Sequence, residues 1–140
     1  MIRLRTSAIP VVVYFALTTA TTLQAQERMR AGMWENTVTS SSGQTSTRSS
    51  CMKPAEAAMS NGSQAIIRAE TEKVVLKSGC TLKDFKLDGD TITQNMVCQG
   101  STIVSVTTFH GGDSFETKTT YREGGTTGVT QIKGRRTGPC

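Results

Sequence analysis

The sequence is poor in aromatic and histidine side chains. Aromatic residues make up 5% of the chain, and His110 is the only histidine. Single strands of nucleic acid bind on aromatic side chains set among basic ones, and no stretch interleaves the two types here. A catalytic triad needs a histidine between a nucleophile and an orienting acid, and near His110 the sequence offers only Ser105, Ser114 and Asp113 beside a Gly-Gly turn. We therefore expect no nucleic-acid partner and no enzyme activity.

Long hydrophobic runs are also missing. The apolar run 11–17 falls short of the roughly 20 residues that a transmembrane helix needs. It follows two arginines within the first five residues and leads to Ala25, an order typical of a secretory signal peptide. We expect 1–25 to be removed and 26–140 to form a single small domain without a transmembrane anchor, periplasmic or secreted. Removal of the two arginines lowers the net charge from +5 to +3.

Large aliphatic side chains are scarce as well. Over 26–140, Leu, Ile, Val and Phe together account for 18 of 115 residues. This fraction is below the level of about one fifth at which disorder becomes a concern. Four cysteines compensate, because an even number in an exported chain indicates disulfides. The spacing of the cysteines includes no CxxC pair, and no histidine lies nearby, unlike the ligands of a zinc site. The four are Cys51, Cys80, Cys98 and Cys140. We expect two disulfides, no metal and no cofactor.

Alternation of apolar and polar side chains indicates β-strands over most of the chain. Trp34 and Val38 alternate with polar residues, and Phe115 to Tyr121 alternate with charged or polar ones, as in half-buried strands. Short turns between successive strands predict a mainly β fold, an antiparallel meander that forms a curved sheet or a partly open barrel. The expected strands are 33–40, 45–51, 81–87, 91–98, 102–109, 114–122 and 126–135.

The segment between the second and third strands predicts a short helical region. Pro54 suits the first turn of a helix over 53–61. Asn61-Gly62-Ser63 matches the pattern for N-glycosylation, but a turn that ends this helix explains it better. Over 64–78, the β-branched aliphatic residues Ile66, Ile67, Val74 and Val75 suit either a helical face or an extended segment. The charged and polar residues between them favour a helix.

A hairpin brings two of the cysteines together. Asp88-Gly89 lies midway between Cys80 and Cys98, and an Asp-Gly pair between two strands is a strong signal for a tight turn. If the last strand pairs antiparallel with the first, the strand directions place Cys51 and Cys140 at one end of the sheet. This favours bonds between Cys80 and Cys98 and between Cys51 and Cys140. Bonds joining Cys51 to Cys80 and Cys98 to Cys140 remain the alternative if the closing strand lies elsewhere.

Several short motifs over 32–140 together resemble one protein family. They are Gly32-Met33-Trp34-Glu35, Cys51-Met52-Lys53-Pro54, Gly79-Cys80, Asp88-Gly89-Asp90, Met96-Val97-Cys98 and the ending Lys133-Gly134-Arg135-Arg136-Thr137-Gly138-Pro139-Cys140. The set is similar to the bacterial periplasmic family catalogued as domain of unknown function 3617. The family name assigns no activity. The resemblance therefore implies a periplasmic domain with a framework of four cysteines, and it implies no catalytic residue.

The basic C-terminal end is the candidate binding surface. Alternation along the last strand places Lys133 and Arg135 on one face, with Arg136 at the strand end. Such a patch can hold the phosphates of lipid head groups or another polyanion, or it can be a solvated strand end that protects the sheet edge from aggregation. We expect a non-catalytic periplasmic binding or envelope-support module, whose partner is a hydrophobic small molecule or an anionic envelope component. An enzyme of unknown reaction is the alternative.

Overall fold

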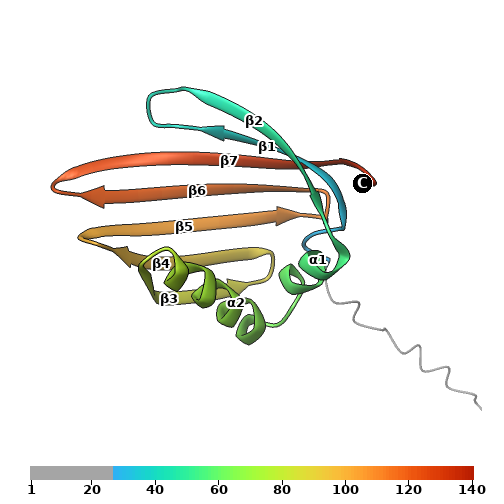
Figure 1. Ribbon diagram of the computed structural model, residues 1–140, viewed down its shortest axis with the longest axis horizontal. Coiled ribbons are helices and arrows are strands. Elements are labelled where there is room, and N and C mark those ends of the chain that lie inside the picture. Colours follow the sequence, from blue (N-terminus) through green and yellow to red (C-terminus); the bar gives the residue numbers. More distant parts are fainter. Residues whose placement is uncertain (1–26) are drawn as a thin grey trace, which may run out of the picture.

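A computed structural model describes residues 27–140, which form one open antiparallel sheet with two helices (Figure 1). The expected signal peptide lies outside the described residues. The predicted meander is confirmed, and the sheet of seven strands has the order β2-β1-β7-β6-β5-β4-β3. The strands are β1 (Gly32–Thr39), β2 (Thr45–Met52), β3 (Cys80–Asp88), β4 (Thr91–Cys98), β5 (Ser101–His110), β6 (Ser114–Glu123) and β7 (Thr126–Gly138).

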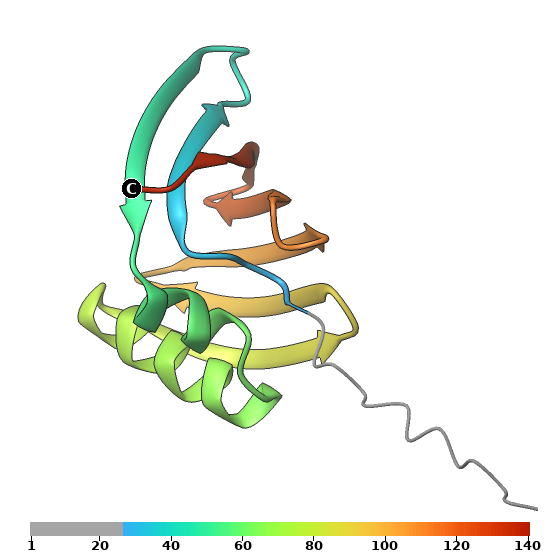
Figure 2. The ribbon, with the colours of Figure 1, turned by 90° about the vertical axis from the view of Figure 1, so that its right-hand side faces the viewer.

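The two helices lie between β2 and β3, as predicted, and cover one end of the concave face of the sheet (Figure 2). They are α1 (Pro54–Ser60) and α2 (Gln64–Lys77). The Ser63 hydroxyl caps α2 by accepting the N–H of Ile66. Ile67 and Val75, two turns apart on one face of α2, are buried against Leu82 and Phe85 of β3. Ile67 and Val75 thus form the packed face of the helix, whereas Ile66 and Val74 are exposed.

The hairpin of β3 and β4 shows how the chain keeps two cysteines opposite each other. Asp88 pairs with Thr91, so the turn consists of Gly89 and Asp90, one residue later than an Asp88-Gly89 turn. Gly89 has φ +57°, a left-handed conformation that glycine adopts without steric cost. A bulge between Leu82 and Asp84 absorbs the extra residue. Cys80 consequently pairs directly with Cys98.

Two disulfides join the sheet in the connectivity that the strand directions favour. Cys80 bonds to Cys98 within the hairpin, and Cys51 bonds to Cys140, which lies 89 residues away in sequence. The second bond forms because β1 pairs antiparallel with both β2 and β7. That arrangement brings the end of β2 and the end of the chain to one side of the molecule. The bond therefore ties an edge strand to the C-terminus.

A second cluster of apolar side chains centres on Trp34. Its side chain is 1% exposed and packs with Met29, Phe109 and Phe115. The Trp34 indole N–H donates to the carbonyl oxygen of Arg30 over 2.9 Å. The polar segment that precedes β1 therefore contributes to the core, since Met29 is buried and pairs with Gly112 in an isolated bridge.

The segment before β1 also holds the corner between the two helices. The Asn61 amide oxygen accepts the backbone N–H groups of Arg28 and Met29 at 2.7 and 3.0 Å, and its NH₂ group donates to the Met29 carbonyl at 2.8 Å. The Arg28 guanidinium donates to the carbonyls of Ser60, Gly62 and Gly89. These bonds explain why Asn61 belongs to a structural turn.

Replacement of Asn61 by alanine removes all three amide hydrogen bonds. At roughly 1 kcal/mol for each bond, we expect Asn61→Ala to lower the free energy of unfolding by about 2–3 kcal/mol. Urea unfolding followed by Trp34 fluorescence measures the change. Gln131→Ala, an exposed site on β7, is the matched control and should change the free energy by less than about 0.5 kcal/mol. Equal effects of the two substitutions would show that Asn61 does not anchor the corner.

Candidate functional site

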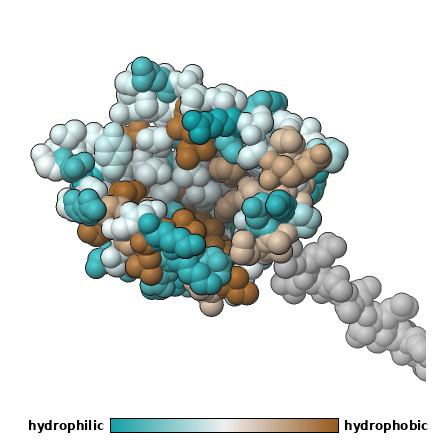
Figure 3. Space-filling view, in the orientation of Figure 1, coloured by the Kyte–Doolittle hydropathy of each residue, from teal (hydrophilic) through white to brown (hydrophobic). Residues whose placement is uncertain are grey.

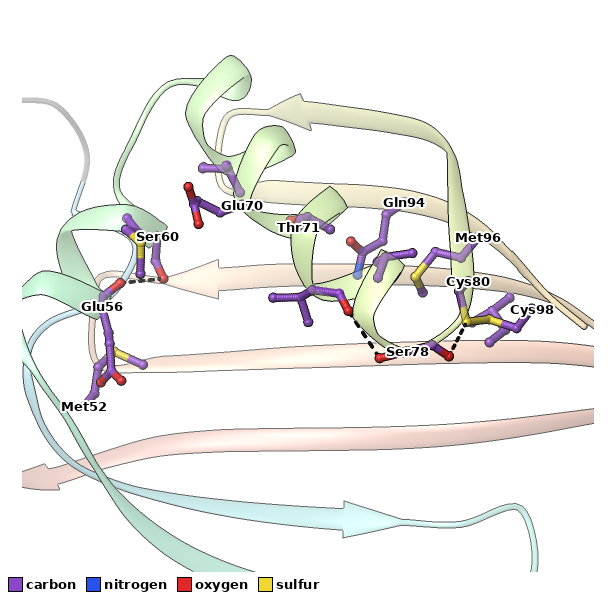
Figure 4. A pocket seen from close by; sticks show the side chains of 15 residues that line it. Met52, Glu56, Ser60, Glu70, Thr71, Ser78, Cys80, Gln94, Met96 and Cys98 are labelled. Atoms are coloured by element: carbon purple, nitrogen blue, oxygen red, sulfur yellow. Dashed lines mark hydrogen bonds between the residues drawn. A yellow bond between two sulfur atoms is a disulfide. The ribbon is translucent and has the colours of Figure 1, made fainter.

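An apolar groove of about 670 Å³ lies between the helices and the concave face of the sheet (Figure 4). Its apolar lining comes from elements far apart in the sequence: Met52 from the end of β2, Met59 from α1, Ile67 and Val74 from α2, and Ile103 from β5. Met96 and the disulfide between Cys80 and Cys98 complete the floor. The volume falls in the range of about 300–1,000 Å³ typical of small-molecule sites.

The groove exists because the helices cover only part of the concave face. α2 packs along β3, the edge strand, where Val75 reaches Leu82 and Phe85. The inward side chains of β4 and β5 continue beyond this contact, as Met96 pairs with Ile103 across the two strands. Met59 is 43% exposed and Val74 is 64% exposed. Apolar side chains of both helices therefore meet solvent at the groove.

The polar groups of the groove are acidic or neutral. Glu56 and Glu70 belong to its lining together with Thr71, Ser78 and Gln94. Glu56 accepts the backbone N–H of Lys53 at the start of α1, and Glu70 pairs with Lys73 at 2.7 Å. The lining contains no lysine, arginine or histidine. The groove thus suits an apolar group without negative charge, because the two carboxylates repel an anion.

The basic C-terminal residues lie on both faces of the sheet. Lys133 and Arg135 point to the convex face, where they pair with Glu116 at 3.2 Å and Glu35 at 3.0 Å. β7 continues to Gly138, so Arg136 lies within the strand and turns to the concave face. Its Nε atom donates to the carbonyl oxygen of Ala31 over 2.8 Å. The three cations therefore do not form a single surface patch, and Lys133 and Arg135 have acidic neighbours.

His110 and Ser105 lie on opposite faces of the sheet. His110 is exposed at the end of β5 and pairs across the turn with Ser114. Ser105 lies on the concave side, where it is 4% exposed and bonds to Thr119. Asp113 pairs with Arg30 at 3.0 Å. The residues that the sequence placed near His110 are thus not assembled into a triad.

The groove residues were not identified as a site from the sequence. Methionine side chains commonly fill gaps in a core, whereas the structure places Met52, Met59 and Met96 in the groove lining. Two sequence patterns relate to the groove: the apolar face of α2, and Met96 and Cys98, which lie on one face of β4. Neither pattern says that the helix stops short of the neighbouring strands.

Residues 27–140 lack two kinds of functional feature. Within these residues, no helix has the length and apolar character to cross a bilayer. Among the same residues, no three His, Cys, Asp or Glu side chains converge as a set of metal ligands. The four cysteines are joined in the two disulfides. The groove combines accessible apolar side chains with neighbouring polar groups, and we take it as the candidate site.

Comparison with known proteins identifies a family without an assigned activity. The family described as "Protein of unknown function (DUF3617)" matches residues 29–140, which includes all seven strands and both helices. No curated protein and no solved structure is similar enough to be matched. The family match spans the groove and all four cysteines. The chain therefore belongs to the DUF3617 family.

Proposed function

We propose that the chain is an exported, non-catalytic binding protein of the periplasm that holds an uncharged apolar small molecule in its groove. The observation that carries this proposal is the open groove of about 670 Å³, with an apolar lining and no basic side chain. Burial of apolar surface contributes about 25 cal/mol per Å². An alkyl chain or a fused ring system that covers the exposed faces of Met59 and Val74 is the ligand that this lining favours.

Export is supported by two independent features. Both disulfides join residues on separate strands or at the C-terminus, and structural disulfides persist in oxidising compartments. The basic, apolar and small-residue order of the first 25 residues is typical of a cleaved secretory signal. A periplasmic binding role also fits the thin core, because a domain with few large aliphatic residues gains stability from the disulfides rather than from filling the concave face.

The groove can be tested with a neutral probe and two neighbouring substitutions. N-phenyl-1-naphthylamine becomes fluorescent in apolar surroundings and should bind the disulfide-bonded protein saturably. Ile103 lines the groove, whereas Val104, the next residue, is 37% exposed and points to the convex face. We expect Ile103→Trp to fill the groove and weaken binding tenfold or more. Val104→Trp should leave the affinity unchanged within twofold.

Urea unfolding of both tryptophan variants verifies that they are folded. Two results would contradict the proposal: a fluorescence rise that does not saturate, or equal affinities of the Ile103 and Val104 variants. In either case the probe would be adsorbing to general apolar surface rather than entering the groove.

A further inference from the structure

Beyond the groove, the concave face continues as a row of hydroxyl groups. Figure 3 shows a pale hollow next to the brown side chains around the helices. Ser105 and Thr119 bond through their hydroxyls at 3.0 Å, and Thr107 and Thr117 do so at 2.8 Å. These four residues, here called the hydroxyl ladder, lie in register on β5 and β6. Ser105 is buried, and the other three are half-buried.

The hydroxyl ladder retains hydrogen-bonding capacity. A hydroxyl group offers one donor and two acceptor positions. Each bonded pair uses one donor and one acceptor, so one donor and three acceptor positions remain in each pair. A ligand can reach those of the half-buried Thr107, Thr117 and Thr119, whereas Ser105 is buried beneath the surface. A surface that presents donors and acceptors side by side matches a ligand whose own groups are hydroxyls, because a hydroxyl also both donates and accepts.

Tyr121 provides an aromatic surface between the ladder and the groove. It follows Thr119 on the same face of β6 and pairs across the strands with Ile103 of the groove. Its ring lies over Gly128, where an added Cβ atom would meet the ring directly. The side chain is nevertheless 37% exposed. An aromatic ring that packs on a glycine of the sheet and remains accessible offers apolar surface to a ligand.

Charge is kept away from this face of β6. Glu116, Lys118 and Arg122 alternate with the ladder residues and with Tyr121, so they point to the convex side. The inward positions of the same strand, from Phe115 to Tyr121, are uncharged. A charged head group at the ladder would therefore lose its hydration without a partner of opposite charge on β5 or β6. Arg136, the cation of β7 on the concave face, already donates to the Ala31 carbonyl.

We propose that the hydroxyl ladder and Tyr121 bind a neutral carbohydrate head group, while the alkyl chain of the same molecule occupies the groove. This inference rests on the proposed function and specifies its ligand as a neutral glycolipid. The pairing of Tyr121 with Ile103 makes the two parts continuous. The sugar ring has apolar C–H faces for Tyr121 and hydroxyls for the ladder, and the acyl or alkyl chain meets Met96 and Met59.

Decyl amphiphiles that differ only in the head group test this assignment. Decyl maltoside, decylphosphocholine and decyl sulfate are titrated, below their micellar concentrations, into the disulfide-bonded protein by calorimetry, with free maltose as the carbohydrate alone. We expect decyl maltoside to bind at least tenfold more tightly than the two charged amphiphiles. Free maltose should bind at least a hundredfold more weakly than decyl maltoside, because it lacks the chain.

Two substitutions on β6 distinguish a specific carbohydrate site from non-specific adsorption of the amphiphile. Thr117→Val removes a ladder hydroxyl with little change of volume, and Tyr121→Ala removes the ring. Each should weaken decyl maltoside binding threefold or more and leave decylphosphocholine binding unchanged. Thr120→Val, which makes the same replacement on the convex face, is the matched control and should have no effect on either ligand.

The outcomes distinguish the two proposals. Equal affinities for the three decyl amphiphiles, with no effect of Thr117→Val or Tyr121→Ala, would overturn the carbohydrate assignment. The proposed binding of an apolar ligand in the groove would still hold. Tight binding of free maltose would overturn the assignment of a glycolipid and indicate that the ligand is a soluble sugar. A lack of binding by every decyl amphiphile would overturn the carbohydrate assignment and the proposed function together.

Discussion

Replacement of both Cys51 and Cys140 by serine is expected to lower the free energy of unfolding by about 4.5 kcal/mol. The bond closes a loop between residues 89 apart, and the entropy that such a loop removes from the unfolded chain corresponds to roughly this value. Because small domains have a net stability of about 5–15 kcal/mol, the variant should be close to unfolding at 37 °C. Chemical unfolding of the oxidised protein and the variant measures the difference.

The second disulfide is the matched control for the first. Cys80 and Cys98 are separated by 18 residues, so their joint replacement by serine should cost only about 3 kcal/mol. The backbone pairing of these two positions does not depend on the sulfur atoms, so we expect it to persist in the variant. If the two double variants lose equal stability, or if the hairpin bond contributes more, loop closure is not the reason that these bonds stabilise the domain.

Trp34→Ala is expected to destabilise the protein by about 4 kcal/mol. Large-to-small substitutions of buried aromatic residues cost about 3–5 kcal/mol, since the transfer free energy is lost and a cavity remains. The side chain is 1% exposed, and its ring centroid lies 5.7 Å from that of Phe115. The carbonyl of Arg30 also loses the indole donor. Urea unfolding followed by far-ultraviolet circular dichroism measures the effect without the tryptophan signal.

Two further substitutions separate packing from hydrogen bonding at this position. Trp34→Phe keeps an aromatic ring but removes the indole N–H, and it should cost about 1–2 kcal/mol. Val97→Ala removes a side chain that is 37% exposed on the convex face, and it should cost less than about 1 kcal/mol. An effect of Trp34→Ala no larger than that of Val97→Ala would show that the Trp34 cluster is not a main core of the domain.

Much of the fold follows from alternation and strand direction. The alternating residues of β6 pointed to opposite faces as expected, with Thr117 and Thr119 inward and Glu116 and Lys118 outward. The first and last strands pair as predicted, and this pairing places Cys51 near Cys140. These features depend on a period of two and on short connections, which the sequence displays directly.

Other features depend on contacts that a local pattern does not record. The bulge between Leu82 and Asp84 moves the hairpin turn by one residue, and the sequence contains no proline or glycine there to signal it. Arg136 points to the concave face because β7 continues to Gly138. The groove is harder still to foresee, because its lining is set by the placement of α2 over β3, and packing of helices on sheets is determined by tertiary contacts.

The bond between Cys51 and Cys140 also determines how the folded chain carries a mechanical load. A force applied between residue 27 and Cys140 passes along the chain to Cys51 and then through the two sulfur atoms. Only the stretch from residue 27 to Cys51 can extend, by at most about 80 Å at roughly 3.4 Å per residue. Strands β3 to β7 and both helices lie within the covalent ring. The backbone that lines the groove therefore carries no tension from the chain ends, whereas β1, β2 and the contacts of Arg28 and Met29 with Asn61 yield.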